Sequence, residues 1–288
     1  MIAIFRHELS SYFTSLTGYV FGAFLLLFAG IYTMVYNLNN LVTNFEYVPG
    51  SMPFVFLVIV PILTMRVLAE ERRQRTDQLL YSLPLSMTEV VLGKYAAMLV
   101  LFLLPLAVIS LYPIVLSAFG SVYFPAAFSA LVSFFFLGAA LIAIGTFVSS
   151  VTESQAVAAG LCFVVMLVNY FLSGLAGYVS TSAFSSLLAF TVLVIALVLI
   201  LYLMTKNSVI SLTIGIVLEG VLLLFYGFNS AAFEGLFPEV MEQLSLFERF
   251  YDVIDGVFDL TTIVYYLSVI AVFLFLSVQS MEKRRWSE

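Results

Sequence analysis

Residues 66–95 read RVLAEERRQRTDQLLYSLPLSMTEVVLGKY, and this polar stretch interrupts an otherwise apolar chain. The whole sequence is 63% hydrophobic and only 10% charged, whereas ordinary soluble domains carry about 25% charged residues. The chain is therefore that of an integral membrane protein. Five of its eleven lysines and arginines nevertheless gather in this one stretch: Arg66, Arg72, Arg73, Arg75 and Lys94.

The first half of the stretch has the pattern of a helix with one charged and one apolar face. Glu70 stands three residues before Arg73 and Glu71 four before Arg75, a spacing that favours intrahelical ion pairs. An apolar stripe follows at i, i+3, i+4 and i+7, formed by Thr76, Leu79, Leu80 and Leu83. The pattern predicts a helix that continues from the preceding membrane span.

The second half of the stretch predicts a stop and a new start. Pro84 ends the first helix, and Ser86 to Glu89 reads SMTE, a capping box that opens a second helix through Gly93 into the next span. Residues 70–93 are thus expected to form a helix, a turn and a helix on the cytoplasmic surface. The alternative is an ordinary positively charged loop that only fixes the orientation of the chain.

Runs of about 20 apolar residues are needed to cross a hydrocarbon core of about 30 Å. Eight such runs are predicted, at about 18–36, 52–69, 96–117, 126–148, 156–179, 183–204, 209–228 and 260–279. An even number places both termini on one side, and a cytoplasmic N-terminus puts ten of the eleven basic residues inside. Only Arg249 then lies outside, so both termini are expected to be cytoplasmic. The expected fold class is an all-α polytopic membrane protein with one transmembrane domain over residues 1–288.

Residues 1–16 are expected to form a helix that lies in the cytoplasmic interface of the membrane. Their apolar and polar side chains separate at helical spacing, with Arg6, Ser10 and Thr14 on the polar side. The apolar side comprises Ile2, Phe5, Leu9, Phe13 and Leu16. The alternative is that these residues are only an irregular start of the first span.

Residues 229–259 are expected to form a structured, acidic cap on the extracellular side. A short helix near Pro238 would place Val240, Met241, Leu244 and Phe247 on one apolar face. Asp252, Asp255 and Asp259 stand at i, i+3 and i+7, so on a helix they would share a face that an extracellular partner could bind. Calcium binding and a simple solvated acidic face are the alternatives.

The sequence lacks the usual parts of an active site. It has one histidine, His7, and one cysteine, Cys162, so a zinc-type cluster of cysteines and histidines and an intramolecular disulfide are both ruled out. It contains no Gly-x-x-x-x-Gly-Lys-[Ser/Thr] phosphate-binding loop. We therefore expect no catalytic activity, no metal and no cofactor in this chain, and ATP, if it is used, must be bound by another chain.

One carboxyl group is predicted at membrane depth. Glu219 lies halfway along the seventh predicted span, where an ionisable residue is either part of a transport path or a buried, hydrogen-bonded group. Asn169, near the middle of the fifth span, is expected to form an interhelical hydrogen bond. Glu219 leaves open a second class of function, an ion-coupled secondary transporter.

The polar stretch carries a family resemblance. Residues 69–95 resemble the segment between the second and third spans of ABC-2-type transporter permeases, with Arg75 in place of the usual glycine and Asp77–Gln78 in place of the usual Thr-x-Glu step. The matching residues are Glu70, Glu71, Arg72, Arg73, Thr76, Leu79, Leu80, Pro84, Gly93 and Lys94. The N-terminal FRHELSSYFTSLTGYVF and the C-terminal FDLTTIVYYLSVIAVFLFLSVQSMEKRRW resemble the gliding-motility and nitrous-oxide-maturation branch of that superfamily.

This resemblance implies the membrane subunit of an ABC transporter, an exporter, in the bacterial cell membrane. It implies a partner ATP-binding subunit, a second permease in a homodimer or heterodimer, and no nucleic acid. Residues 1–16 would be the connecting helix and residues 70–93 the coupling helices. The residues that would couple to the ATPase are Glu70, Glu71, Arg72, Arg73, Arg75, Thr76, Leu79 and Leu80.

Overall fold

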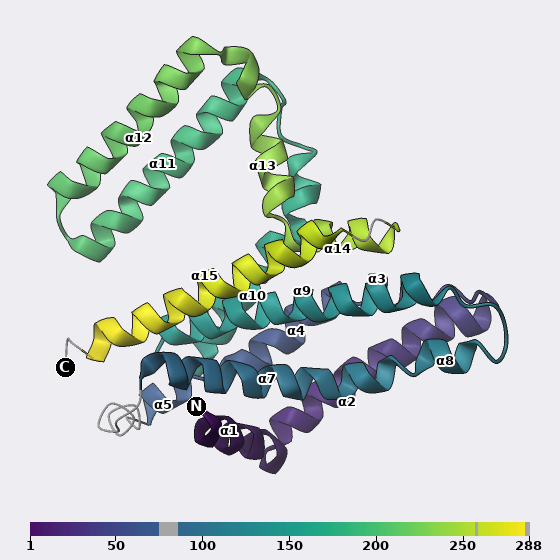
Figure 1. Cartoon of the computed structure of the whole chain (residues 1–288). Coiled ribbons are helices and arrows are strands. Elements are labelled where there is room, and N and C mark those ends of the chain that lie inside the picture. Colours follow the sequence, from purple (N-terminus) through teal and green to yellow (C-terminus); the bar gives the residue numbers. More distant parts are fainter. Residues whose placement is uncertain (75–85, 257–258, 286–288) are drawn as a thin grey trace. The chain divides into compact units, whose positions relative to one another are not determined.

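Every regular element is a helix in the part of the chain that the structure describes, residues 1–74, 86–256 and 259–285 of a computed structural model (Figure 1). The chain divides into two units, Met1–Val168 with Arg249–Glu288, and Asn169–Glu248. We call them unit 1 and unit 2. The described residues confirm the prediction of an all-α fold.

Unit 1 holds the N-terminal helices and the last helix of the chain. Its elements are α1 (Ile2–Thr14), α2 (Leu16–Thr33), the π-helix η1 (Met34–Asn39), α3 (Tyr47–Ser51), α4 (Pro53–Thr64), α5 (Ala69–Arg73), α7 (Met87–Ile109), α8 (Tyr112–Leu116), α9 (Phe124–Val151) and α15 (Leu260–Arg285). Unit 2 contains α11 (Ala183–Thr205), α12 (Ser208–Phe228), the 3-10 helix η2 (Ser230–Phe233) and α13 (Leu236–Leu244). Helices α10 (Gln155–Ala176) and α14 (Leu246–Ile254) each begin in one unit and end in the other.

Seven helical segments of the described residues are long and apolar enough to cross a membrane. They are Leu16–Asn39, Pro53–Arg73, Met87–Leu116, Phe124–Val151, Gln155–Ala176, Ser208–Phe228 and Leu260–Arg284. The remaining predicted span, 183–204, is the helix α11, whose described apolar part, Ala183–Leu199, is shorter than the others. The chain is therefore a multi-pass α-helical membrane protein.

Helix α9 forms the centre of unit 1, since 78% of the residues in its most apolar 18-residue stretch are buried. Small residues let neighbouring helices approach it closely. A side chain at Gly138 would collide with the Phe102 ring, and one at Gly145 would collide with Thr64. Helices α4, α7 and α15 all pack on α9, and α15 runs alongside it in Figure 1.

Three phenylalanines join α4, α7 and α9 in the interior of unit 1. The rings of Phe56 and Phe134 stack with centroids 4.6 Å apart, and Phe102 lies edge-on to Phe56 at 5.7 Å. All three side chains are at most 1% exposed. Aromatic pairs in these arrangements add attraction beyond the area they bury, so this cluster fixes how the three helices meet.

The second span is not one continuous helix, contrary to the expectation that it runs into the polar stretch. Helix α4 ends at Thr64, three residues after Pro61, and α5 begins only at Ala69. Pro61 cannot donate a backbone hydrogen bond, which weakens the helix near its end. The residues between form a turn in which the Val67 amide donates to the Thr64 carbonyl at 3.2 Å.

The third span begins as the sequence predicts. The Glu89 amide donates to Ser86 Oγ at 3.2 Å, and the Ser86 amide donates to Glu89 Oε2 at 3.4 Å, which completes the capping box of α7. Helix α7 then continues without interruption through Gly93 and Lys94. The predicted second helix of the polar stretch is thus the first part of α7.

Helix α1 confirms the predicted helix over residues 1–16, but a different face of it contacts the rest of unit 1. Ile4 lies against Gly93 of α7, and Tyr12 is buried. Ile2 and Leu16, on the predicted apolar face, are 71% and 80% exposed. The residues of α1 that face α7 therefore recur at multiples of four positions, and its exposed apolar side chains remain able to contact lipid.

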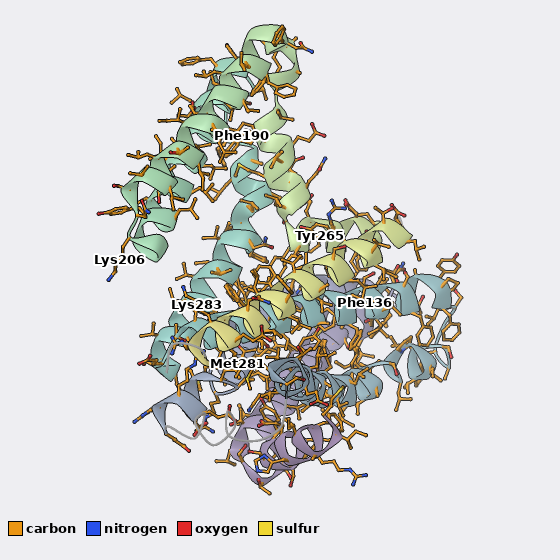
Figure 2. The ribbon with its side chains drawn as sticks, turned by 60° about the vertical axis from the view of Figure 1, so that its left-hand side comes forward. Phe136, Phe190, Lys206, Tyr265, Met281 and Lys283 are labelled. Carbon is orange, nitrogen blue, oxygen red and sulfur yellow. The ribbon has the colours of Figure 1, made fainter. Side chains whose placement is uncertain are left out.

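Unit 2 is built on a hairpin of α11 and α12. Lys206 takes a left-handed conformation (φ 51°) at the tip, and Asn207 Oδ1 accepts hydrogen bonds from the amides of Val209 and Ile210 to cap α12. At the other end, the Phe190 ring lies 5.3 Å from that of Phe237 in α13, and Figure 2 labels Phe190 and Lys206 at these two places. Aromatic packing and a capped turn thus fix the hairpin at both ends.

Candidate functional site

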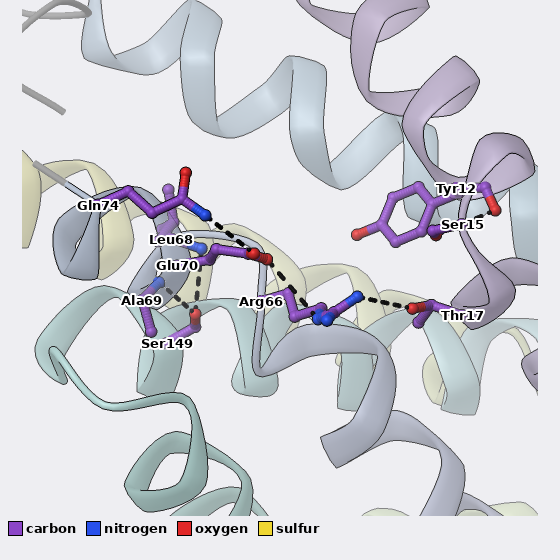
Figure 3. Close-up of polar contacts among 9 residues, drawn as sticks. All are labelled: Tyr12, Ser15, Thr17, Arg66, Leu68, Ala69, Glu70, Gln74 and Ser149. Atoms are coloured by element: carbon purple, nitrogen blue, oxygen red, sulfur yellow. Dashed lines mark hydrogen bonds and ion pairs between the residues drawn. The ribbon is translucent and has the colours of Figure 1, made fainter. Parts of the chain in front are cut away.

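The beginning of the polar stretch is anchored to α9 by one serine. Ser149 Oγ accepts hydrogen bonds from the amides of Leu68 and Ala69, at 3.2 and 3.1 Å, and all three groups are buried (Figure 3). Amides at the start of a helix have no partner within the helix, so an outside acceptor determines where α5 can begin. Ser149 therefore sets the position at which the chain leaves the second span.

Arg66 links this turn to the start of α2. Its Nη1 donates to Thr17 Oγ1 at 3.2 Å, and its Nε lies 3.6 Å from Glu70 Oε2. Glu70 Oε1 also accepts a hydrogen bond from Gln74 Nε2 at 3.2 Å, so Figure 3 shows a continuous chain of polar contacts from Thr17 to Gln74. In the described residues Glu70 is thus paired with Arg66, and the predicted pair with Arg73 is wrong.

Lys94 carries the most enclosed charge of this region. Its Nζ lies 2.6 Å from Glu8 Oε1 of α1 and 2.7 Å from Glu71 Oε1 of α5. The Lys94 side chain is only 3% exposed, and those of Glu8 and Glu71 are 16% and 24% exposed. We call these three residues the Lys94 cluster. It joins α1, which precedes the first span, to α5 at the end of the second span and to the start of α7, the third span.

Tyr12 lies close to the Lys94 cluster and adds to its enclosed character. Burial raises the pKa of the Tyr12 phenol well above its ordinary value, and the negative charge of Glu8 raises it further. The phenol therefore stays protonated at any physiological pH. It encloses the ion pairs on the α1 side without adding a charge.

Arg72 is directed into the protein rather than toward a partner. It is 8% exposed and its Nη1 donates to the Thr152 carbonyl, at the end of α9, at 3.2 Å. On α15, Arg284 lies 3.1 Å from Glu153 and donates to the Val151 carbonyl at 3.2 Å. The end of α9 is therefore bound by arginines from two separate helices.

The predicted ATPase-coupling residues divide into three groups. Arg73 is exposed and Glu70 is partly exposed, so both can be reached by another protein. Glu71 and Arg72 are committed to contacts within the chain. The others, Arg75, Thr76, Leu79 and Leu80, lie outside the described residues.

Sequence patterns did not single out Ser149, Glu8 or Lys94 as members of one site. The sequence places Lys94 among the basic residues of the polar stretch and Glu8 within the expected helix over residues 1–16, with no sign that the two meet. The sequence signal for this cluster is a lysine directly before an apolar span, together with a glutamate in each of two other polar segments. Ser149 gives no sequence signal, because serines at helix ends are common.

Glu219 forms one hydrogen bond in the α11–α12 hairpin. Thr191 Oγ1 donates to Glu219 Oε1 at 2.8 Å, whereas Glu219 Oε2 is buried and has no hydrogen-bond partner among the described residues. Gly215, one turn away on α12, lies against Val198 of α11. The two helices therefore enclose the carboxyl group between apolar side chains and one hydroxyl.

Asn169 makes the hydrogen bonds that its place in the fifth span predicts. Its Nδ2 donates to the Leu244 carbonyl at 3.1 Å, and its Oδ1 accepts from the Leu246 amide at 3.0 Å. It thus ties α10 to the junction of α13 and α14. The acidic segment is structured as expected, but Ser245 separates Leu244 and Phe247 onto different helices, so their predicted common face is wrong.

The three aspartates of the acidic segment do not share a helix face. Asp252 and Asp255 are exposed in and just after α14, which ends before Gly256 (φ 101°). Asp259 instead accepts the Thr261 amide at 3.0 Å and caps α15. The described residues contain no group of three or more histidine, cysteine, aspartate or glutamate side chains that could hold a metal ion.

The arrangement around α5 can transmit a displacement. Helices α1, α5 and α7 contribute the charged groups that meet here, and α9 contributes the Ser149 hydroxyl. A displacement applied to α5 would therefore reach its neighbours through ion pairs and hydrogen bonds.

Comparison with known families agrees with this organisation. The family described as "ABC-2 family transporter protein" matches residues 33–206, which include the second span, the polar stretch and the α9 anchor. No curated protein matches the chain closely enough to count as a relative. The matched region covers more than half of the sequence, and the chain belongs to the ABC-2 family of transporter membrane proteins.

Proposed function

We propose that this chain is the permease subunit of an ATP-binding-cassette exporter, in which a separate subunit hydrolyses ATP and drives transport across the cell membrane. The observation that carries the proposal is the anchoring of α5 by Ser149 on α9. A loop that served only to hold positive charge inside would need arginines but no buried cap. The anchor fixes where α5 begins within the polar stretch.

In the proposed complex both termini are cytoplasmic, and α1 and the polar stretch face the ATPase. Two permeases pair, as identical copies or with a related chain, and each rests on one ATP-binding subunit. Exposed Arg73 and partly exposed Glu70 contact the ATPase. Arg75, Thr76, Leu79 and Leu80 are proposed to contact it as well, as the family resemblance implies.

Charge reversal at Arg73 tests the docking of the ATPase. The tagged chain is purified from its native membrane, and a bound protein with a phosphate-binding loop is identified by mass spectrometry and assayed for ATP hydrolysis. Arg73→Glu is expected to lower the recovery of this subunit about tenfold, because reversing a charge at a contact adds repulsion. The matched control is Lys283→Glu, a reversal at an exposed residue of α15.

Two results would contradict the proposal. One is purification of an intact permease with no ATP-binding subunit, even after cross-linking in the membrane. The other is equal recovery of that subunit with Arg73→Glu and with wild type.

Glu219 supports a second candidate function, an ion-coupled secondary transporter. Its buried Oε2 without a described partner is the kind of intramembrane acceptor that a transported ion would use. Proteoliposomes that hold this chain alone, without ATP, would then transport under a proton gradient and lose transport with Glu219→Gln. Strict dependence on ATP would exclude this function.

A further inference from the structure

The position of Lys94 raises a question that stability alone does not answer. A lysine with a 3% exposed side chain has been removed from water and is matched by two carboxylates. Buried ion pairs are often no more stable than apolar residues of similar volume, because the charges lose their hydration. The contacts of Lys94 are therefore better explained by the arrangement that they impose.

The two partners of Lys94 depend on it to different degrees. Helix α1 also packs on α7 through apolar contacts, since Ile4 lies against Gly93. Helix α5 has only five residues. The structure shows it attached to α7 by the 2.7 Å ion pair between Glu71 and Lys94. Ser149 fixes the start of α5 and Arg72 ties its end to the Thr152 carbonyl of α9, so Lys94 is placed to link α5 to α1 and α7.

We infer that Lys94 is a positioning residue that makes α1, α5 and α7 move as one body when the coupling segment is displaced. The inference rests on the proposed function, because the displacement would come from the ATPase. An ammonium group has three donors, and here two of them hold carboxylates from different helices at 2.6 and 2.7 Å. One side chain thus transmits the position of α5 to both neighbours.

Distances between spin labels on α1 and α5 test this inference. The native Cys162, which is buried, is replaced by serine, and labels are attached to His7→Cys and Gln74→Cys, both at exposed positions. In the otherwise wild-type permease the distance distribution should be narrow. It should stay unchanged when ATP is added to the complex with the ATPase, while other distances in the permease change.

Two variants separate positioning from folding. Lys94→Met leaves two carboxylates without their cation and can disturb folding. The matched variant Glu8→Gln, Lys94→Met and Glu71→Gln removes all three charges together, so it should keep the melting temperature close to that of wild type. In this variant the α1–α5 distribution should broaden about twofold, since a contact that opposes local opening is lost.

The outcomes are distinct. A narrow distribution in the folded triple variant would overturn the inference, because the contacts of α5 with Ser149, Arg66 and Thr152 would then be enough to hold it. A broad distribution in the triple variant and a narrow one in wild type would support it. If no ATPase binds wild type, the proposed function fails, and this result is separate from the label distances in the permease alone.

Discussion

Carboxylates are withdrawn from water in two regions of this chain, and the two regions neutralise them differently. In unit 1, Glu8 and Glu71 share the ammonium group of Lys94. In unit 2, Glu219 receives one hydrogen bond from the Thr191 hydroxyl, and its second oxygen is buried without a described partner. The first region depends on charge balance and the second on one neutral contact, so mutations should affect them to different degrees.

The largest effect is expected from Lys94→Met. Removing one member of a buried ion pair leaves an uncompensated charge and lowers the free energy of unfolding by about 3–5 kcal/mol. Thermal unfolding of the detergent-solubilised chain measures this loss. A melting temperature equal to that of wild type would show that Glu8 and Glu71 are solvated and do not depend on Lys94.

A smaller effect is expected from Glu71→Gln or Glu8→Gln. Lys94 keeps one carboxylate in each variant, and the amide keeps a hydrogen-bonding group, so a loss of about 1–3 kcal/mol is expected. The same unfolding assay should show that each single variant is more stable than Lys94→Met. The opposite order would mean that Lys94 is not the charge on which the stability of the cluster depends.

A still smaller effect on stability is expected from Glu219→Gln. The amide oxygen can still accept from Thr191, and hydrogen bonds between membrane helices contribute about 0.6 kcal/mol on average, so the change should stay below about 1 kcal/mol. Comparing the thermal unfolding of Glu219→Gln with that of Thr191→Val measures the contribution of this hydrogen bond from each of its two partners. A transport defect without a stability defect would identify Glu219 as functional and not only as a packing residue.

The smallest effect concerns Asp259, a carboxylate that is exposed to water. The hydrogen bond from the Thr261 amide lowers the pKa of this carboxyl below its ordinary value. The ionised carboxylate therefore stabilises the start of α15 above the ordinary aspartate pKa of about 4. This stabilisation is lost as the pH falls through the lower pKa of the folded state. Hydrogen exchange at the start of α15 should accelerate only under acid conditions, and Asp259→Asn should remove that pH dependence.

Much of the fold could be predicted from hydropathy and local signals. Seven helical segments lie at predicted spans, and the capping box at Ser86 and the hydrogen bonds of Asn169 were correctly predicted. These features depend on residues close in sequence or on composition alone. Pro61 is a local signal for a weakened second span, but the point at which α5 begins could not be predicted, because Ser149, the acceptor of the Leu68 and Ala69 amides, lies about 80 residues away.

The candidate site was predictable only in part for the same reason. The polar stretch pointed to the correct segment, but the sequence could not show that Glu71 pairs with Lys94, 23 residues on, or that Glu8 joins them from 86 residues away. It also treated Arg72 as a docking residue, although it is buried against the end of α9. Which charges face a partner and which face the protein is decided by packing, and helical spacing does not reveal it.

The interruption of the second span has a mechanical consequence. A continuous helix would act as a stiff rod and carry a push along its own axis into the membrane, whereas a rod cut at Thr64 cannot. A push on α5 must instead pass sideways, through Lys94 to α1 and α7 and through Ser149 to α9. If the proposed ATPase supplies this push, it is divided among several neighbouring helices of unit 1, so these helices would tilt or rotate together and would not be driven like a piston.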